Sequence, residues 1–240
     1  MLALVRTCLF VTFSFALTVT YGFTSLLLGG LSQVTRHRII ISWCHLVIGL
    51  AKWICGVKYR VTGKEHLEGL AGPVVVMSKH QSTWETLYLQ ILFFPAATIL
   101  KKQLLDIPFF GWGLKGLRPI AIDRDNPREA LRQVKAGGVQ SIQDNLNVII
   151  FPEGTRMEPG EHGKYARSGA EIAITAQTKV VPIAMNAGVY WPNKAFKKHP
   201  GTIDVVIGEP IETEGLTTRE LTEKVEQWIE SHMQQLPTSR

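Results

Sequence analysis

Residues 78–85 contain side chains that suit proton transfer. His80 follows an apolar run, residues 73–77, that predicts a buried strand, so this histidine falls at a strand end. Open α/β sheets bind their ligands at strand ends, and an imidazole exchanges its proton near neutral pH. Glu85 lies five residues further on and could hold the imidazole in one tautomer. We therefore take His80 as a candidate general base and Glu85 as the residue that orients it.

A structural interpretation of Glu85 competes with this chemical one. Ser82 to Glu85 fits the capping-box pattern S-x-x-E, in which the glutamate only satisfies a backbone donor at a helix start. Residues five apart on a continuous helix lie about 140° apart around its axis, at roughly 100° per residue. The helix must therefore begin after His80, and the pattern predicts that it begins at Ser82. A covalent route through Ser82 is disfavoured, because its hydroxyl would be poorly placed for a ring two residues away.

Residues 152–156, Pro-Glu-Gly-Thr-Arg, form a second candidate group. They follow an apolar run, residues 147–151, that predicts another buried strand. Arg156 offers a planar fork to a phosphate, Thr155 adds a hydroxyl donor, and Gly154 lets backbone N–H groups approach closely. The competing interpretation is a turn in which Arg156 pairs with a neighbouring glutamate. Alone, the motif does not decide between an anion site and a turn.

Arg124 follows a third apolar run, residues 119–122, and could likewise pair only with a neighbouring aspartate. Three predicted strand ends thus carry His80, Arg124 and Arg156. Because such ends can meet at one edge of a sheet, we expect the base and the two cations to lie close together. That repetition favours a site over three unrelated turns.

Residues 101–113 begin with two lysines and continue with aromatic side chains between glycines. Phe109 and Phe110 either belong to the core or form, with Trp112, an apolar floor where a lipid enters. Lys101 stands at the end of a possible strand, residues 96–100. The sequence leaves both interpretations of the aromatic residues open.

Basic charge in this 240-residue chain is concentrated in its N-terminal quarter. Seven lysines and arginines precede Glu65, the first acidic residue, while the remaining 19 basic residues nearly balance 20 acidic ones. Residues 8–28 carry no charge, and this length meets the roughly 20 residues needed to cross a bilayer. Basic residues beside apolar helices indicate an anionic lipid surface, whereas a nucleic-acid-binding protein would need a basic patch on its folded body.

The first thirty residues could also be a secretory signal peptide, but their apolar core is too long and no A-x-A-like site follows. A second apolar segment, residues 39–57, either returns across the membrane or lies along it. Arg36 and Arg38 between the two segments favour a cytoplasmic junction. Cys8, Cys44 and Cys55 are odd in number and lack metal-ligand spacing, which fits a reduced cytoplasmic protein. We expect the inner membrane, with the body facing the cytoplasm.

Strands alternate with helices after residue 60, which predicts an α/β sheet covered on both faces. The predicted strands are residues 58–62, 73–77, 96–100, 119–122, 147–151, 179–186 and 202–207, and the predicted helices are residues 84–93, 127–144, 168–177 and 217–236. Gly137 and Gly138 are expected to loosen the second of these helices. We expect a membrane hairpin in residues 1–60 and one catalytic domain in residues 61–240.

These motifs together resemble the glycerolipid acyltransferase family, and most of all the bacterial 1-acyl-sn-glycerol-3-phosphate acyltransferases. The family has four sequence blocks, and four blocks occur here in the same order between about Val74 and Asn186. They are His80 to Glu85; Lys101-Lys102 with residues 108–112 and Ile122-Asp123-Arg124; Phe151 to Arg156; and Val181-Pro182-Ile183. Each block is weak alone, but four in order are specific.

The resemblance implies a mixed, mostly parallel sheet flanked by helices, and transfer of a fatty acyl group from acyl-CoA or acyl carrier protein to the sn-2 hydroxyl of lysophosphatidic acid. His80 would be the base and Glu85 its orienting residue, without an acyl-enzyme. The implied phosphate-binding residues are Arg156, Thr155, Gly154, Glu153, Arg124 and Lys101, and the implied lipid-binding residues are Phe109, Phe110 and Trp112. No metal or other cofactor is expected, and the partners would be the lysolipid, the acyl donor and membrane lipids.

The sequence departs from the family pattern at two places. Glu85 stands where an aspartate is usual, and only Arg167 supplies the basic pair that often follows the third block. These departures leave the orientation of His80 and the phosphate contacts open. Two alternatives also remain: an acyltransferase for another lysolipid, such as a lyso-ornithine lipid or lysophosphatidylglycerol, and a non-catalytic lipid-binding protein with the same fold.

Overall fold

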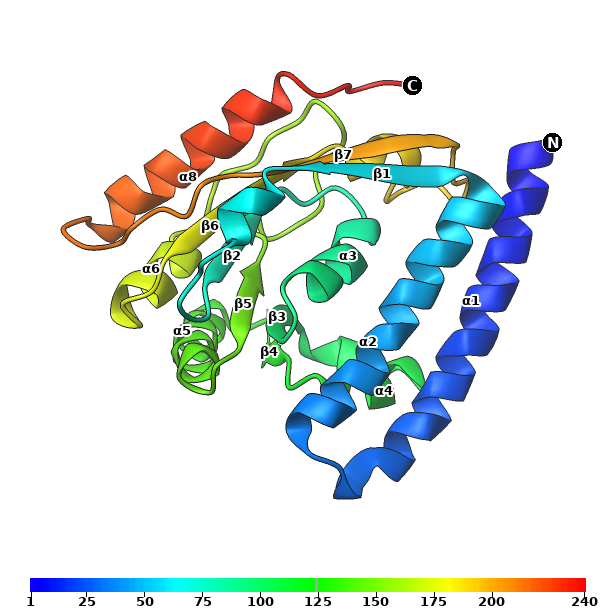
Figure 1. The fold of residues 1–240 in the computed structure, drawn as a ribbon, viewed down its shortest axis with the longest axis horizontal. Coiled ribbons are helices and arrows are strands. Elements are labelled where there is room, and N and C mark those ends of the chain that lie inside the picture. Colours follow the sequence, from blue (N-terminus) through cyan, green and yellow to red (C-terminus); the bar gives the residue numbers. More distant parts are fainter. Residues whose placement is uncertain (124) are drawn as a thin grey trace.

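A seven-stranded sheet forms the centre of the protein (Figure 1). The computed structural model describes residues 1–123 and 125–240. The strands are β1 (Val57–Thr62), β2 (Val75–Ser78), β3 (Ala96–Lys101), β4 (Ile120–Ile122), β5 (Asn147–Ile150), β6 (Val180–Met185) and β7 (Gly201–Ile207), in the order β1-β7-β6-β2-β5-β3-β4. The five strands from β6 to β4 are parallel, while β7 pairs antiparallel with β6 and parallel with β1. The prediction of a mixed, mostly parallel sheet is confirmed.

Helices cover both faces of this sheet (Figure 1). They are α1 (Leu2–Leu27), α2 (Gln33–Leu50), α3 (Trp84–Leu92), α4 (Phe110–Gly116), α5 (Pro127–Gln143), α6 (Ser168–Thr175), α7 (Ala187–Tyr190) and α8 (Thr218–Met233). Short 3-10 helices occupy Leu28–Gly30, Lys64–Leu67 and Lys102–Asp106, and a π-helical turn occupies Ala51–Cys55. Helices α2 and α3 pack on one face, and α5, α6 and α8 pack on the other.

The strand sequences explain why both faces are covered. Successive side chains of a strand point to opposite faces, and here both sets are apolar. On β2, Val76 packs in the cluster that contains Trp84 of α3, while Val75 packs in the cluster that contains Ile172 of α6 and Leu221 of α8. The short apolar runs that predicted buried strands therefore form two cores, one on each side of the sheet.

Helix α5 runs unbroken through Gly137 and Gly138, so the prediction that these glycines loosen it is wrong. A Cβ at Gly138 would overlap Ile172 Cδ1, and a Cβ at Gly137 would lie 2.9 Å from Ile120 Cγ2. The glycines therefore allow α5 to lie close to α6 and β4. Asn126 caps the helix by accepting a hydrogen bond from the Glu129 backbone N–H, and Pro127 occupies its first turn.

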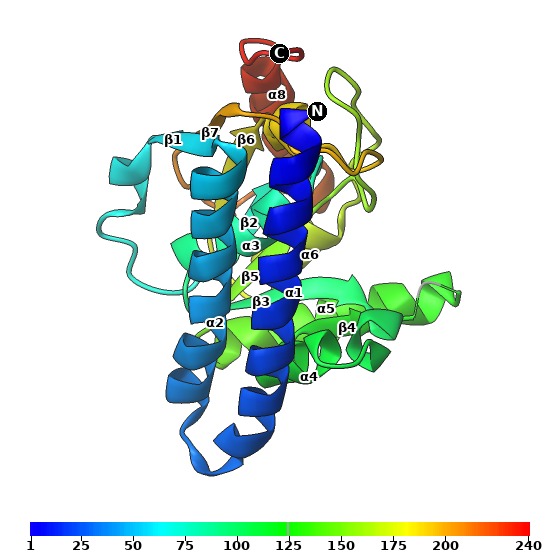
Figure 2. The same ribbon diagram turned by 90° about the vertical axis from the view of Figure 1, so that its right-hand side faces the viewer.

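Helices α1 and α2 form an antiparallel hairpin whose tip projects past α4 (Figure 2). Both helices are long and apolar enough to cross a membrane, and large apolar side chains such as Phe13, Phe15 and Leu27 are exposed on α1. Exposed apolar surface of this extent marks an interaction with lipid or protein. The composition and the exposure together indicate that the hairpin associates with a membrane.

The hairpin is continuous with the rest of the protein, the body that contains the sheet. Helix α2 packs against α3, and α1 packs against α4. The π-helical turn after α2 ends at Gly56, whose φ of 74° starts the chain into β1. Strand β1 then joins the sheet at Val57, three residues before the predicted boundary at residue 60. The hairpin therefore contributes structure to the body as well as apolar surface.

Candidate active site

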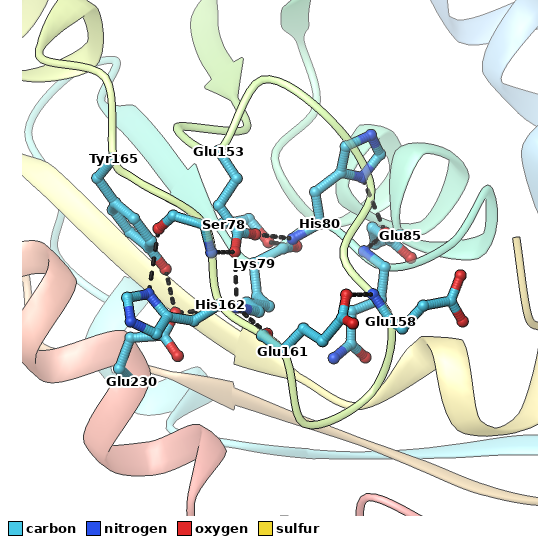
Figure 3. A network of polar contacts seen from close by, with 12 residues as sticks. Ser78, Lys79, His80, Glu85, Glu153, Glu158, Glu161, His162, Tyr165 and Glu230 are labelled. Atoms are coloured by element: carbon cyan, nitrogen blue, oxygen red, sulfur yellow. Dashed lines mark hydrogen bonds and ion pairs between the residues drawn. The ribbon is translucent and has the colours of Figure 1, made fainter.

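His80 lies on the short loop between β2 and α3, with its ring turned toward Glu85 (Figure 3). His80 Nδ1 donates a hydrogen bond of 3.0 Å to Glu85 Oε1, and the ring stacks on Phe151 at a centroid distance of 4.0 Å. The backbone is held as well, because the Met157 N–H donates to the His80 carbonyl at 2.8 Å. Only 14% of the His80 side chain is exposed. Since Glu85 occupies Nδ1, Nε2 is the nitrogen left to meet a substrate.

Glu85 is fully buried in the first turn of α3, and one of its oxygens does two things. Oε1 accepts the His80 Nδ1–H and also the backbone N–H groups of Gln81 and Ser82, at 2.6 and 2.5 Å. A carboxylate is well placed at a helix N-terminus, where the helix dipole favours negative charge. The same oxygen of Glu85 therefore both binds the His80 ring and satisfies backbone donors near the helix start.

The start of α3 differs from the prediction. The helix begins at Trp84, with Thr83 as its N-cap, and not at Ser82. Ser82 Oγ accepts the Trp84 N–H at 3.1 Å, so the full capping box expected between Ser82 and Glu85 does not form. Gln81 and Ser82, which precede the N-cap, instead turn their N–H groups inward to Glu85, and this turn brings His80 back over the carboxylate.

Glu153 points into the protein, although the sequence motif placed it among the phosphate-binding residues. Its Oε1 accepts hydrogen bonds from Lys79 Nζ at 2.6 Å and from the Gly163 N–H at 3.1 Å, and its Oε2 accepts the His80 N–H at 3.2 Å. None of the Glu153 side chain is exposed. This placement corrects the expectation, because Glu153 lies outside the cavity lining and an ionised carboxylate has no N–H or O–H donor for a phosphate.

Arg156 is free of the carboxylates that could have paired with it. Among the described residues it forms no ion pair, and its Nη1 donates to Asn193 Oδ1 at 2.8 Å. Its Nε is buried without a hydrogen-bond partner in that same part of the chain. Gly154 turns the loop with a φ of 69°, and Thr155 is exposed beside it. The Gly154 N–H already donates to the Phe151 carbonyl at 3.0 Å, so the loop presents guanidinium and hydroxyl donors that the other described residues leave available.

A cavity of about 980 Å³ joins His80 to this loop and extends away from it between the helices. Its polar end contains His80, Gly154, Thr155, Arg156 and Asn193. The rest is mostly apolar and is lined by α3, β3, α4 and α5 and by the hairpin, through residues that include Leu87, Leu100, Leu114, Ile122, Val134, Tyr21, Gly22, Ile40 and Trp43. A cavity with one polar end and an apolar body has the form expected for an amphiphilic ligand.

The predicted lipid-contacting residues separate in the structure. Phe109, Phe110 and Lys101 line the cavity, whereas Trp112 lies outside its lining and packs against Phe109 and against Phe23 of α1. The Trp112 ring joins α4 to the hairpin, and its contact with lipid stays a prediction. Arg167 is also outside the lining, exposed at the start of α6, and the Arg124 prediction falls on a residue outside the described ranges.

Phe109 adopts an unusual backbone conformation, with φ 64° and ψ −56°, and the Phe110 N–H donates to the Pro108 carbonyl at 2.7 Å. This is a γ-turn of the rare, strained type. A Cβ at Gly22 of α1 would lie 2.6 Å from Phe109 Cα, so only glycine allows the helix to pass the turn. The contact fixes the hairpin against the floor of the cavity.

The sequence analysis missed three kinds of site residue. Lys79 is completely buried beside His80, Asn193 contacts Arg156 from a distant loop, and the hairpin supplies Tyr21, Gly22 and Trp43 to the cavity. Lys79 adjoins the histidine in sequence, which was the one available signal. The other contacts join segments far apart in the chain, where residue spacing gives no indication.

Comparison with known proteins places this geometry in a family. The chain matches the family model described as Acyltransferase over residues 58–186. It is 40% identical over 237 residues to the 1-acyl-sn-glycerol-3-phosphate acyltransferase of Pseudomonas aeruginosa, covering 97% of this chain and 91% of that protein. It is 29% identical over 168 residues to the human 1-acyl-sn-glycerol-3-phosphate acyltransferase alpha, covering 69% of this chain and 59% of the human protein.

A solved structure has the same fold. The crystal structure of the 1-acyl-sn-glycerophosphate (LPA) acyltransferase from Thermotoga maritima superposes with a TM-score of 0.80 at 22% identity, covering 97% of this chain and 95% of that one. The family model covers more than half of the chain and includes both His80 and the 152–156 loop. With the order of the motifs and the geometry of the site, these matches show that the chain belongs to the acyltransferase family.

Proposed function

We propose that the protein transfers a fatty acyl group from acyl-CoA or acyl carrier protein to the sn-2 hydroxyl of 1-acyl-sn-glycerol-3-phosphate, giving phosphatidic acid. The observation that carries the proposal is the position of His80: its Nδ1 is bonded to Glu85, and it lies at the polar end of a large apolar cavity, near Arg156. The names of the Pseudomonas aeruginosa and human relatives support the same acceptor.

His80 is the general base in this proposal. Its Nε2 takes the proton of the acceptor hydroxyl while the hydroxyl oxygen attacks the thioester carbonyl, a contribution typically worth about 10²–10⁴-fold in rate. Glu85 stabilises the imidazolium that forms. The tetrahedral intermediate then collapses, the C–S bond breaks, and His80 returns the proton to the leaving thiolate. The backbone N–H of Thr155 is the proposed donor to the oxyanion, since the neighbouring Gly154 N–H already donates to the Phe151 carbonyl.

Arg156 positions the acceptor through its phosphate. The guanidinium presents a planar set of donors that matches phosphate geometry, and Thr155 and Lys101 line the same cavity and add a hydroxyl and a second cation. The acyl chain of the acceptor then lies in the apolar part of the cavity against Phe109 and Phe110. Holding the hydroxyl beside His80 in this way can supply several kcal/mol of the rate enhancement.

We propose that the hairpin dips into the cytoplasmic leaflet of the inner membrane, with the body in the cytoplasm. Helices α1 and α2 pack on α4 and α3, so the hairpin lies against the body and does not cross the bilayer separately from it. The hairpin also lines the cavity, which would let a lysolipid pass from the leaflet to His80 without crossing water.

An acceptor panel with purified protein tests this function. Lysophosphatidic acid, lysophosphatidylglycerol and a lyso-ornithine lipid are each supplied with labelled acyl-CoA or acyl carrier protein, and the product is quantified by chromatography. We expect lysophosphatidic acid to give the highest kcat/KM, and His80→Ala to lower kcat by about 10³-fold or more with unchanged melting. Strong activity only on the phosphate-free acceptor would reject the proposed substrate. A folded His80→Ala protein with near-normal kcat would reject the base.

A further inference from the structure

Lys79 precedes His80 and is buried completely, which is rare for a lysine. An ammonium group has three N–H donors, and Lys79 Nζ has three acceptors: Glu153 Oε1 at 2.6 Å, the Glu161 carbonyl at 2.9 Å and Glu230 Oε1 at 3.0 Å. Figure 3 shows these groups converging on the lysine, while the His80 ring points away from them toward Glu85. The buried charge is therefore fully satisfied.

Glu153 connects this lysine to the histidine. One oxygen of its carboxylate binds Lys79 Nζ and the other accepts the His80 backbone N–H at 3.2 Å. The His80 peptide is thus held by a carboxylate whose own position depends on Lys79. On the opposite side, Glu85 holds the ring, so the histidine is fixed at its backbone and at its side chain by two different carboxylates.

Glu230 brings the C-terminal helix α8 into the same network. It lies 151 residues from Lys79 in sequence, and besides the lysine it accepts a hydrogen bond of 2.8 Å from the Tyr165 hydroxyl. Burial, with the nearby carboxylate of Glu230, raises the pKa of Tyr165 above its usual range, so the phenol remains a donor. The network therefore has a second, neutral contact that keeps Glu230 directed at Lys79.

We propose that Lys79 is a positioning residue for catalysis, which couples α8, through Glu230, to the backbone of His80, through Glu153. The inference rests on the proposed role of His80 as the base. An ion pair buried this deeply is weak evidence for stability, since an apolar replacement of both partners is often as stable. Removal of one partner alone, however, leaves an unpaired buried charge beside the His80 peptide. Such a variant should therefore lose catalytic rate, because the position and the charge state of the His80 imidazole change.

The charged groups that surround His80 set the expected pH dependence. Among the described residues, those bonded to His80 are Glu85 of α3 and Glu153 of the loop after β5, with Lys79 and Glu230 of α8 linked through Glu153, while Arg156 and Lys101 line the same cavity. The base must be neutral to act, so kcat/KM falls at low pH as the imidazole becomes charged, and this fall is the acid limb of the pH profile. Loss of the Lys79 cation favours the imidazolium and moves this acid limb to higher pH. Loss of the Glu153 anion moves it to lower pH.

The test uses the full-length protein with Lys79→Met, Glu153→Gln and the double variant. We expect Lys79→Met to lower kcat by about 10²-fold, with KM for the lysolipid changed by less than about threefold, because substrate contacts are untouched. The acid limbs of the two single variants should move in opposite directions. The double variant, which removes both buried charges together, should recover about tenfold in kcat over Lys79→Met.

Glu230→Gln provides a milder test should Lys79→Met fail to fold, because the Glu230 side chain is 21% exposed. We expect a loss of about three- to tenfold in kcat at unchanged KM. Glu223→Gln, on the exposed side of the same helix, is the matched control and should behave as wild type. Wild-type kcat and an unmoved acid limb in Glu230→Gln would overturn the coupling to α8.

The result for His80→Ala separates the two proposals. An inactive His80→Ala protein together with folded Lys79→Met and Glu153→Gln proteins of wild-type kcat and pH profile overturns the role of Lys79 alone. Near-normal activity of folded His80→Ala overturns the proposed function and, with it, the inference.

Discussion

The polar part of the cavity has a base end around His80 and an anion end around Arg156. The two ends differ in how many hydrogen bonds the protein itself supplies to their side chains. At the base end, Glu85 and Glu153 are fully buried, and both accept several protein donors. At the anion end, Thr155 is exposed, and within residues 1–123 and 125–240 the Arg156 guanidinium donates one hydrogen bond, to Asn193. The proposed base is therefore arranged before any substrate arrives, whereas the proposed anion end still has donors to offer.

This difference follows from what each end must do in the proposed reaction. A proton transfer depends on the distance and the tautomer of the base, and these are best fixed by buried hydrogen bonds. A phosphate supplies its own hydrogen-bond acceptors, so the residues that bind it can remain partly hydrated until the substrate binds. Substitutions at the base end should therefore change mainly kcat, and substitutions at the anion end should change mainly KM.

Glu85→Gln should produce the largest effect of the variants that sharpen this comparison. The amide oxygen can still accept the Gln81 and Ser82 N–H groups, but the negative charge that stabilises the imidazolium is lost. We expect kcat to fall by about 10²-fold, with KM and the melting temperature nearly unchanged. Steady-state kinetics and thermal unfolding measure this directly.

Glu129→Gln is the matched control, because Glu129 also lies in the first turn of a helix but its own side chain does not line the cavity. It should retain wild-type kinetics. A Glu85→Gln protein with a lower melting temperature and an unchanged kcat would show that the carboxylate only stabilises the start of α3. That result would reject its role in orienting His80.

Arg156→Lys should have a smaller effect, and in the other kinetic parameter. A lysine keeps the charge but loses the planar fork, and with it bidentate recognition of a phosphate. We expect KM for the lysolipid to rise about tenfold, with kcat reduced by less than about threefold. Arg132→Lys, at an exposed position of α5, is the control. A fall in kcat at unchanged KM would show that Arg156 acts in the chemical step and not in binding the lysolipid. That result would contradict the proposed difference between the two ends.

The sequence predicted the sheet and the contact between His80 and Glu85 because both depend on local patterns. Short apolar runs gave each strand to within a few residues, since the parallel strands are buried on both faces. The spacing of His80 and Glu85 required a break in the helix between them, and the structure contains one. The position of the break was wrong by two residues, because Ser82 binds the Trp84 N–H and not that of Glu85.

Long-range contacts account for what the sequence could not predict. Glu153 was assigned to the phosphate from its motif, yet its partner Lys79 is 74 residues away, and Glu230 reaches the same lysine from α8. A local pattern shows that a charged residue follows a strand but not the side on which its partner lies. The role of the hairpin in the cavity was missed for a similar reason: its apolar sequence indicates burial without distinguishing lipid from protein.

Ser82→Ala should have the smallest effect, and it tests whether the base end works without a covalent step. Ser82 is fully buried and its Oγ accepts the Trp84 N–H at 3.1 Å. Alanine removes this hydrogen bond to the first N–H of α3, and a hydrogen bond of this kind contributes about 1 kcal/mol to the free energy of unfolding. The backbone N–H of residue 82 still binds Glu85, so His80 keeps its orientation, and we expect kcat to stay within about threefold of wild type.

Denaturant unfolding and steady-state kinetics measure the two effects of Ser82→Ala separately. Ser168→Ala is a suitable comparison, because Ser168 is also buried and lines the same cavity without contacting Glu85 or the helix start of α3. A loss of kcat of about 10³-fold or more in Ser82→Ala, with trapping of an acylated wild-type enzyme, would point to a nucleophilic serine. If the acceptor hydroxyl attacks the thioester directly, Ser82→Ala should lower the free energy of unfolding and leave kcat nearly unchanged. The reaction then depends on the His80 imidazole and not on the Ser82 hydroxyl.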